Sequence, residues 1–268
     1  METENRIEVA KRAVMAQTDL LHREFGRARR MTKSDGSQVT PVDIAISEDL
    51  QRTITAAFPD DEFFSEELAD AAGPALLRAR FAWVLDPIDG TDNYAAGVPF
   101  CAISLGLLEH GVPVYGIIYD LCRRVLMHGG PGRGLWNGGE AAQVRPEPPH
   151  ALSLIGFHTP VDEAFAQAGT RVIRDFKIRE LGSATLHLAY VAAGMLDGVV
   201  GHNVKVWDVA AACALCAAGR GEVCFLDGDL FPLRKFDVNM GGVRYVAGNP
   251  VVCSRLKAIV AGEVLAGL

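Results

Sequence analysis

Residues 83–94, Trp83-Val84-Leu85-Asp86-Pro87-Ile88-Asp89-Gly90-Thr91-Asp92-Asn93-Tyr94, are the stretch that decides the fold of this chain. The apolar residues at its start predict a buried strand that reaches the edge of a sheet. Pro87 fixes one backbone torsion between Asp86 and Asp89 and removes a hydrogen-bond donor. The two carboxylates are close enough in sequence to converge on a hard cation, which prefers oxygen ligands.

Gly90 and Thr91 follow the carboxylates at the start of a predicted helix. Gly90 lets the backbone approach a ligand without a Cβ clash, and Thr91 is suited to cap the helix. Free N–H groups at a helix start favour an anion. Carboxylates for a metal beside amides for a phosphate are the combination that metal-assisted phosphoryl chemistry needs. The alternative is an ordinary turn with solvated carboxylates, because Asp-Pro and Asp-Gly pairs are common in loops.

Composition favours an ordinary globular protein. The chain has 268 residues, of which 49% are hydrophobic and 22% charged, so it is long enough for one large domain or two modest ones. Its core is expected to be large enough to fold without disulfides or a structural metal. A net charge of -7 with no block of like charge argues against a nucleic-acid-binding surface as the main function.

The termini and cysteines predict a cytoplasmic location without a membrane partner. The segment Met1 to Arg12 is charged and lacks the apolar core of a signal peptide, and no apolar run approaches the length of a membrane span. Six cysteines are scattered in apolar surroundings. Cys213 and Cys216 form a CxxC inside an alanine-rich helical pattern, which favours buried small hydrophobes over a redox pair.

Apolar periodicity and turn residues predict an α+β half followed by an α/β half. Three prolines between residues 145 and 150 suggest a boundary, giving domains 1–147 and 148–268. In the first domain we expect helices at about 7–25 and 41–58, a loop or hairpin at 32–38, antiparallel strands at 101–108, 114–119 and 124–128, and a hairpin or loop at 129–139. In the second we expect strands at 152–157, 198–200, 223–226 and 245–247 and helices at 161–176, 183–196, 206–218 and 250–260, alternating as in layered α/β folds.

Further acidic residues are candidates to join Asp86 and Asp89. Each has a simpler interpretation when it is taken alone. The pair Glu66-Glu67 is typical of a solvated loop, because glutamates are seldom fully buried. Asp208 before an alanine-rich helix is a candidate N-cap, and Asp43 in a first helical turn is favoured by the helix dipole.

Taken in order, these segments resemble the inositol monophosphatase family of magnesium-dependent, lithium-sensitive phosphatases. The resemblance covers almost the whole chain and implies an αβαβα layered sandwich, a homodimer and a phosphomonoesterase activity. Five segments carry it: Val39-Thr40-Pro41-Val42-Asp43, Ser65-Glu66-Glu67, Trp83 through Asn93, Gly182-Ser183-Ala184 and Trp207-Asp208-Val209-Ala210-Ala211.

The resemblance also implies a role for each site residue. Glu66, Asp86 and the Ile88 carbonyl would hold one Mg²⁺, and Asp86, Asp89 and Asp208 a second; Glu66 would help bind a weaker third ion through water. Thr91, hydrogen-bonded to Asp43, would orient the attacking water, so Thr91, Asp43 and Glu66 are the catalytic candidates. Lys33 resembles a basic residue of a mobile loop that closes over the metals. The implied substrate-binding residues are Asp89, Gly90, Thr91, Gly182, Ser183, Ala184 and Asp208.

Substrate choice is where the chain departs from the family pattern. Inositol-specific relatives usually carry a sugar-binding glutamate seven positions before the final aspartate, and here that position is Gly201. His202, Asn203 or Lys205 are candidates to replace it, and Lys205 is suited to attract a second phosphate or another anionic group. The alternative for His202 is an exposed loop histidine.

These observations order the functional candidates. A small polyol or sugar monophosphate similar to inositol 1-phosphate comes first, histidinol phosphate second, and a nucleotide or bisphosphate third. Direct attack by water is favoured over an aspartyl-phosphate, which carboxylates also form in some enzymes. A phosphate-ligand-binding protein without turnover is the hypothesis from another class, because a fold does not by itself imply an activity.

Overall fold

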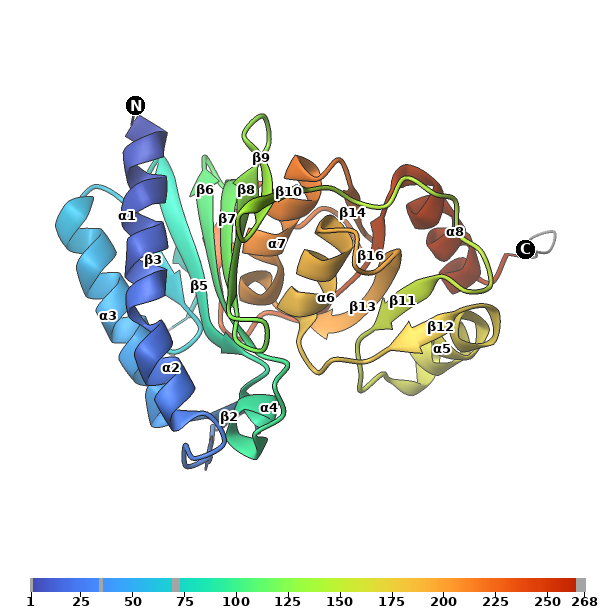
Figure 1. Cartoon of the computed structure of the whole chain (residues 1–268), viewed down its shortest axis with the longest axis horizontal. Coiled ribbons are helices and arrows are strands. Elements are labelled where there is room, and N and C mark those ends of the chain that lie inside the picture. The colour runs from blue at the N-terminus through green and yellow to red at the C-terminus, as the bar shows by residue number, and fades with distance from the viewer. Residues whose placement is uncertain (1, 34–35, 69–72, 264–268) are drawn as a thin grey trace.

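The computed structural model describes residues 2–33, 36–68 and 73–263, which form five layers (Figure 1). Helices cover the outer face of a first sheet, two helices lie between the sheets, and two more cover the far face of a second sheet. The predicted αβαβα sandwich is confirmed. The helices are α1 (Glu2–Ala16), α2 (Thr18–Glu24) and α3 (Pro41–Ala57) outside, α6 (Ala184–Ala192) and α7 (Val206–Ala218) between the sheets, and α5 (Glu163–Asp175) and α8 (Pro250–Ala261) on the far face.

The first sheet has the order β10-β9-β8-β7-β6-β5-β3 within the described residues. Its neighbours are antiparallel except for β3 and β5, which run parallel. The tight spacing of the predicted strands is explained by these hairpins. The strands are β3 (Glu62–Ser65), β5 (Phe81–Asp89), β6 (Ala102–Glu109), β7 (Val112–Asp120), β8 (Val125–Gly130), β9 (Gly134–Asn137) and β10 (Glu140–Ala142).

The second sheet is mixed and has the order β12-β11-β13-β16-β14. Strand β11 runs parallel to both β12 and β13, whereas β16 is antiparallel to β13 and β14. The two sheets divide between residues 142 and 154, the region that contains the predicted boundary. The strands are β11 (Leu154–Phe157), β12 (Lys177–Arg179), β13 (Gly198–Val204), β14 (Glu222–Phe225) and β16 (Val243–Gly248).

Shorter elements complete the described chain. Two small antiparallel pairs form, β1 (Met31–Thr32) with β2 (Gln38–Val39) and β4 (Ala75–Leu76) with β15 (Lys235–Phe236). The ends of the predicted 32–38 loop therefore pair as a hairpin, while residues 34–35 lie outside the described residues, as do residue 1 and residues 264–268 of the predicted domains. Helix α4 (Thr91–Ala96) follows β5 directly.

Some predicted boundaries were wrong for local reasons. The helix expected over 7–25 is divided at Gln17, whose N–H donates to the Val14 carbonyl and whose amide donates to Asp49 Oδ2 at 2.6 Å. Strand β13 is longer than expected and α6 shorter. Cys122 is exposed, contrary to the expectation of buried cysteines, whereas Cys216 is buried.

A bulge in β5 places its two aspartates on one side of the sheet. Successive strand residues alternate between faces, so Asp86 and Asp89, three positions apart, would face opposite sides of a regular strand. Asp86 pairs with Ser104 and Asp89 with Ala102, so three steps on β5 match two on β6. The extra residue restores a common face. The prediction of a buried strand that leads into the two carboxylates is confirmed, because β5 continues through Asp89.

Close packing of α7 against the first sheet positions Asp208. A Cβ on Gly116 of β7 would lie 2.1 Å from the Ala211 oxygen, and one on Gly106 of β6 would lie 3.0 Å from the Ala211 nitrogen. Glycine on the strands and alanine on the helix therefore permit an approach that larger side chains would block. This contact brings the first turn of α7 next to the end of β5.

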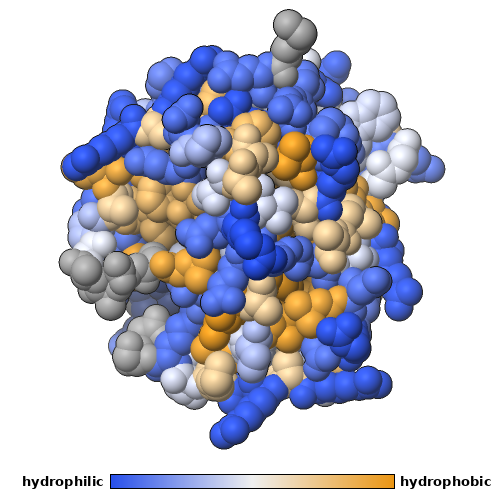
Figure 2. Space-filling view, turned by 90° about the vertical axis from the view of Figure 1, so that its left-hand side faces the viewer, coloured by the Kyte–Doolittle hydropathy of each residue, from blue (hydrophilic) through white to orange (hydrophobic). Residues whose placement is uncertain are grey.

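The outer helical layer has a different character. Figure 2 shows that hydrophilic residues dominate this side of the molecule, with smaller hydrophobic groups between them. Beneath the helices, α1 and α3 pack apolar residues against the first sheet, including Val14, Ile46 and Leu50. No helix in the described part of the chain combines the length and the hydropathy that crossing a membrane requires.

Candidate active site

A cavity of about 270 Å³ opens where β5 ends, beside the first turn of α7. Its wall combines a cluster of acids with the glycine turn after β5 and a few residues from other segments. Lys205 is the only basic side chain among the described lining residues. These residues are Ser37, Gln38, Glu66, Asp86, Ile88, Asp89, Gly90, Thr91, Asp92, Gly182, Lys205, Trp207, Asp208 and Val238.

Three aspartates meet at the base of this cavity. Asp86, Asp89 and Asp208 each offer a carboxylate oxygen, and these oxygens all lie within 4.8 Å of one another. Among the described residues, none of the three forms a salt bridge with a lysine or an arginine. Burial, and then the charges of Glu66, Asp89 and Asp208, raise the pKa of Asp86 well above its ordinary value. Burial and then the charge of Asp89 raise the pKa of Asp208 in the same way.

Asp89 is fixed by the start of α6. Its Oδ2 accepts hydrogen bonds from the Ser183 hydroxyl at 2.5 Å and from the Thr185 amide at 2.7 Å. Ser183 also caps α6, because its Oγ accepts from the Leu186 amide at 3.1 Å. Burial raises the pKa of Asp89, although these hydrogen bonds oppose the shift. Residues from the second half of the chain therefore orient an aspartate of the first half.

Asp208 belongs to the first turn of α7. Its Oδ2 accepts the Lys205 N–H at 2.7 Å, which satisfies one of the free amides at the helix start. The N-cap prediction for Asp208 was wrong in position, because Lys205 is the N-cap of α7 and Asp208 accepts from its backbone three residues later. This hydrogen bond uses Oδ2, so the role of Asp208 as a metal ligand stays a prediction.

Thr91 lies between Asp43 and the backbone of β5. Its Oγ1 is 3.2 Å from Asp43 Oδ1 and 2.9 Å from the Ile88 carbonyl oxygen. The other Asp43 oxygen accepts from the Thr40 amide at 2.8 Å and the Thr40 hydroxyl at 2.6 Å. Burial raises the pKa of Asp43 to about 6 despite these hydrogen bonds. The hydroxyl of Thr91 is thus held in place with a lone pair available to a further donor.

Glu66 and Glu67 share one cation. Lys33 Nζ lies 2.6 Å from Glu66 Oε1 and 2.6 Å from Glu67 Oε1. Burial acts to lower the pKa of Lys33, but the two carboxylates outweigh it and the pKa is raised. Burial, then the charge of Glu66, raises the pKa of Glu67 to about 7. The pair is therefore a partly buried ion pair and not the solvated loop that paired glutamates usually form.

The donor set fits a hard divalent cation such as Mg²⁺. Asp86, Asp89 and Asp208 supply only oxygen ligands, and their pKa shifts record mutual repulsion that a cation would relieve. Glu66 lines the same cavity and is able to join them once Lys33 is displaced.

Gly90 makes the turn between these ligands and α4. Its φ of 86° is in the left-handed region, and a Cβ there would lie 2.8 Å from the Phe100 oxygen. A glycine is therefore required at this position. The turn brings the Gly90 and Thr91 backbone to the cavity wall beside the carboxylates.

The other residues predicted to bind the substrate differ in whether they reach the cavity. Gly182 lines the cavity, whereas Ser183 and Ala184 are buried. Ser183 is occupied by Asp89, so contact of Ser183 or Ala184 with a substrate stays a prediction. His202 is corrected by the structure: its ring packs 4.7 Å from the Phe165 ring and its Nε2 lies 3.2 Å from Asp162 Oδ2. It is buried away from the described cavity wall and is not an exposed loop histidine.

The glycine at position 201 is explained by Tyr245, which the sequence analysis did not identify. A Cβ at position 201 would lie 2.1 Å from Cε1 of Tyr245, which pairs with Gly201 across β13 and β16. The Tyr245 ring therefore occupies the space that a side chain at position 201 would need. Gln38 and Val238, which also line the cavity, come from hairpin and loop segments without a motif. The unexpected glycine was the available signal for a bulky neighbour.

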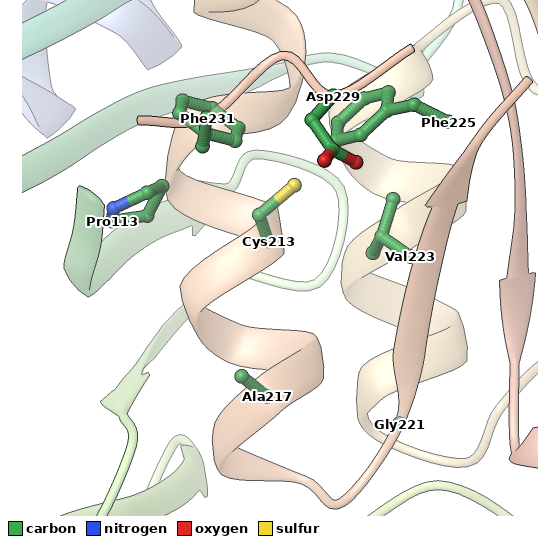
Figure 3. Close-up of a pocket in the computed structure, with 8 residues that line it drawn as sticks. All are labelled: Pro113, Cys213, Ala217, Gly221, Val223, Phe225, Asp229 and Phe231. Atoms are coloured by element: carbon green, nitrogen blue, oxygen red, sulfur yellow. The ribbon is translucent and has the colours of Figure 1, made fainter. Parts of the chain in front are cut away.

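Other features of the molecule are less suited to this chemistry. A second cavity of about 270 Å³ lies beside α7 and is lined by apolar and aromatic residues together with Asp229 (Figure 3). Cys213 faces it, and burial raises the pKa of that thiol to about 12. His158, Glu180 and His187 also cluster, but His187 Nε2 already accepts from the Leu181 amide at 3.0 Å. That bond puts the ring proton on Nδ1 and leaves no lone pair for a metal.

The chain is similar to known proteins in sequence and in fold. The sequence model of the inositol monophosphatase family matches residues 2–266. The "Nus factor SuhB" of Xylella fastidiosa is 31% identical over 235 residues, covering 85% of this chain and 83% of that protein. The "Inositol-1-monophosphatase ImpA" of Mycolicibacterium smegmatis is 35% identical over 219 residues, covering 75% of each. The crystal structure of extragenic suppressor protein suhB from Bartonella henselae shares the fold, with a TM-score of 0.84 at 24% identity over 97% of this chain and 100% of that one.

Proposed function

We infer that this chain, which belongs to the inositol monophosphatase family, hydrolyses a small polyol or sugar monophosphate in a Mg²⁺-dependent reaction. Its relatives of that family are phosphoric monoester hydrolases, and this chain is one too. The observation that carries the proposal is the group of three converging aspartates without a basic partner among the described residues. Mg²⁺ bound there would neutralise phosphate charge and lower the pKa of a bound water.

The chain's own residues have separable tasks in this proposal. Asp86, Asp89 and Asp208, with Glu66 and the Ile88 carbonyl, hold the cations. The Gly90 and Thr91 amides bind phosphate oxygens, an arrangement favoured by the free N–H groups of a helix start. Asp89 is oriented by Ser183 and Thr185, so the metal site depends on both halves of the chain.

Thr91 and Asp43 are proposed to take part in proton transfer from the attacking water. The Thr91 hydroxyl donates to Asp43 or to the Ile88 carbonyl and has a lone pair left to accept a hydrogen bond from water. Asp43 has its other oxygen fixed by Thr40, so the pair has little freedom to rotate. A pKa near 6 suits Asp43 to proton exchange close to neutral pH.

Direct attack by water is supported over an aspartyl-phosphate intermediate. A nucleophilic carboxylate needs a free oxygen with a clear approach to phosphorus. One Asp89 oxygen accepts two hydrogen bonds, one Asp208 oxygen accepts another, and Asp86 is buried. These constraints suit metal ligands better than nucleophiles.

Phosphate release from a panel of monophosphates tests the proposal. The panel is inositol 1-phosphate, histidinol phosphate, fructose 1,6-bisphosphate, 3′-phosphoadenosine 5′-phosphate and 2′-AMP, each with Mg²⁺ and with a chelator added. We expect chelator-sensitive release with a preference for the polyol or sugar phosphates. A preference for histidinol phosphate or a nucleotide would move the substrate assignment, and stoichiometric binding without release would support a binding protein instead.

Three further properties belong to the same proposal. We expect inhibition by Li⁺, because a small monovalent cation competes for a Mg²⁺ ligand set of hard oxygens. We also expect a homodimer in the cytoplasm, which light scattering and cell fractionation test. Li⁺ insensitivity would leave the phosphatase assignment intact and remove the lithium-sensitive one.

A further inference from the structure

Lys205 is a cation on a wall that is otherwise acidic or neutral. Among the described residues that line the catalytic cavity, Glu66, Asp86, Asp89 and Asp208 form the acidic base, and Lys205 is the only basic side chain. No described carboxylate forms an ion pair with it. The bound cations of the proposed reaction neutralise the acidic base, whereas Lys205 has no comparable partner.

The side chain of Lys205 is held in a defined position. Its backbone N–H donates to Asp208 Oδ2 at 2.7 Å, which ties the residue to the metal-binding cluster. Its Nζ donates to the Met240 carbonyl at 2.5 Å. An ammonium has three donors, so two remain for a ligand. The ammonium is thus anchored at one point and still able to bind an anion.

Two of the residues that line the cavity with Lys205 offer no side-chain acceptor to a sugar hydroxyl. Gly201, whose side-chain space is filled by the Tyr245 ring, is not among the described lining residues. The remaining wall near Lys205 includes Trp207 and Val238, which carry no acceptor in their side chains. This side of the cavity therefore offers a cationic donor and apolar surface.

We propose that Lys205 selects a substrate whose leaving group carries a second anionic group, a carboxylate or another phosphate. The proposal rests on the phosphomonoesterase function: with a carboxylate it narrows the monophosphates to phosphorylated acids, and with a phosphate it replaces them by a bisphosphate. The scissile phosphate lies at the carboxylate cluster and the glycine turn, and the rest of the substrate extends along the wall where Lys205 is anchored. A hydrogen bond between a lysine and an anion is charge-assisted, which gives it more discrimination than a bond to a hydroxyl.

Matched substrate pairs measure this selection. In the first pair, 2-phosphoglycerate carries a carboxylate where glycerol 2-phosphate carries a hydroxymethyl group. In the second, fructose 1,6-bisphosphate carries a phosphate that fructose 1-phosphate lacks. We expect kcat/KM to favour the anionic member of at least one pair by about tenfold. The pair that shows the larger ratio distinguishes a carboxylate from a phosphate.

Substitution of Lys205 tests whether this residue causes the preference. Lys205→Met is expected to lower the anionic-to-neutral ratio of kcat/KM by about tenfold, mainly through KM, and Lys205→Arg is expected to retain most of it. Lys235→Met, which alters an exposed lysine outside the cavity, is the matched control and is expected to preserve the ratio. The preference is also expected to weaken with added salt.

The outcomes separate this proposal from the phosphatase function. Release from neutral and anionic members at equal kcat/KM, or an equal loss for both in Lys205→Met, overturns the role of Lys205 and leaves the phosphatase function standing. Absence of release from every compound overturns the phosphatase function. In that case, calorimetry with the same pairs in Mg²⁺ tests the role of Lys205. The proposal requires that the anionic member of a pair binds more tightly than the neutral one, and that this difference in affinity disappears in Lys205→Met.

Discussion

Strand β5 is flanked by two kinds of buried carboxylate site, and they differ in how their charge is balanced. Near its start, Asp61 accepts two hydrogen bonds from the Arg6 guanidinium, at 2.9 and 2.7 Å, and one from the Trp83 indole at 3.0 Å. At its end, Asp86 and Asp89 meet Asp208 with no lysine or arginine partner among the described residues.

The difference distinguishes a structural carboxylate from a functional one. Asp61 is satisfied entirely by the protein, and the Arg6 guanidinium also lies 4.1 Å from the centre of the Phe81 ring. The aspartates at the other end have no basic partner among the described residues, and in the proposed function a bound cation balances their charge. The fold tolerates this repulsion because it is released on binding, whereas an unbalanced charge at Asp61 would have no such compensation.

Asp89→Asn is the change expected to have the largest effect at the functional end. It removes one metal-binding charge, so kcat/KM is expected to fall by at least about 10³-fold. The metal-free variant should melt at or above the wild-type temperature, since like-charge repulsion decreases. Phosphate release and thermal unfolding in chelator check both parts, with Asp229→Asn as the acidic control beside the other cavity. Near-normal activity in Asp89→Asn contradicts the metal assignment.

Asp61→Asn is expected to show the opposite pattern. It leaves the buried Arg6 without its carboxylate, which costs about 3 kcal/mol in the free energy of unfolding. Activity per folded molecule is expected to stay close to wild type. Urea denaturation followed by activity at low denaturant measures the two effects, and Glu8→Gln, an exposed ion-pair variant, serves as the control with a change of less than about 0.5 kcal/mol. A stable but inactive Asp61→Asn protein contradicts the comparison.

The pH dependence of stability in the metal-free protein extends the comparison to Asp43. The pKa of Asp43 in the folded state is about 6, above its value in an unfolded chain. A raised carboxyl pKa means that the folded state binds the proton more tightly than the unfolded chain. Protonation of Asp43 therefore stabilises the folded state at low pH, and this contribution to the free energy of unfolding is lost as pH rises. We expect a loss on the order of 2 kcal/mol between about pH 4 and pH 6, reduced in Asp43→Asn. Urea denaturation across this range in chelator measures it, and stability that rises with pH there contradicts the assignment.

Lys33→Met is expected to have the smallest effect. Lys33 occupies Glu66 in the metal-free protein, so its removal eliminates a competitor for the cation. We expect Mg²⁺ to bind about two- to fivefold more tightly, the size of a partly exposed ion pair. Calorimetric titration measures the change, and Lys11→Met, which alters an exposed ion pair on α1, is the control. Weaker binding in Lys33→Met would mean that Lys33 supports the site and does not compete for it.

Apolar periodicity predicted alternating strands and helices in layers, whereas the convergence of Asp86, Asp89 and Asp208 was implied by the family resemblance that the order of the motifs carries. They did not predict the bulge in β5, since a residue spacing does not state how a neighbouring strand will pair. Nor did they show that Tyr245 fills the space at Gly201 or that Lys33 bridges Glu66 and Glu67. Those contacts join segments far apart in the chain, and only the packed structure brings them together.

Titration of the metal-free protein with Mg²⁺ is the most direct test of the claim that the aspartate cluster binds a divalent cation. Heat of binding, unfolding temperature and phosphate release would be followed at the same Mg²⁺ concentrations in wild type and Asp208→Asn. The account predicts saturable binding, a rise in unfolding temperature and the onset of release over one concentration range, all weakened in Asp208→Asn. An unfolding temperature independent of Mg²⁺ and release that survives chelation would contradict it.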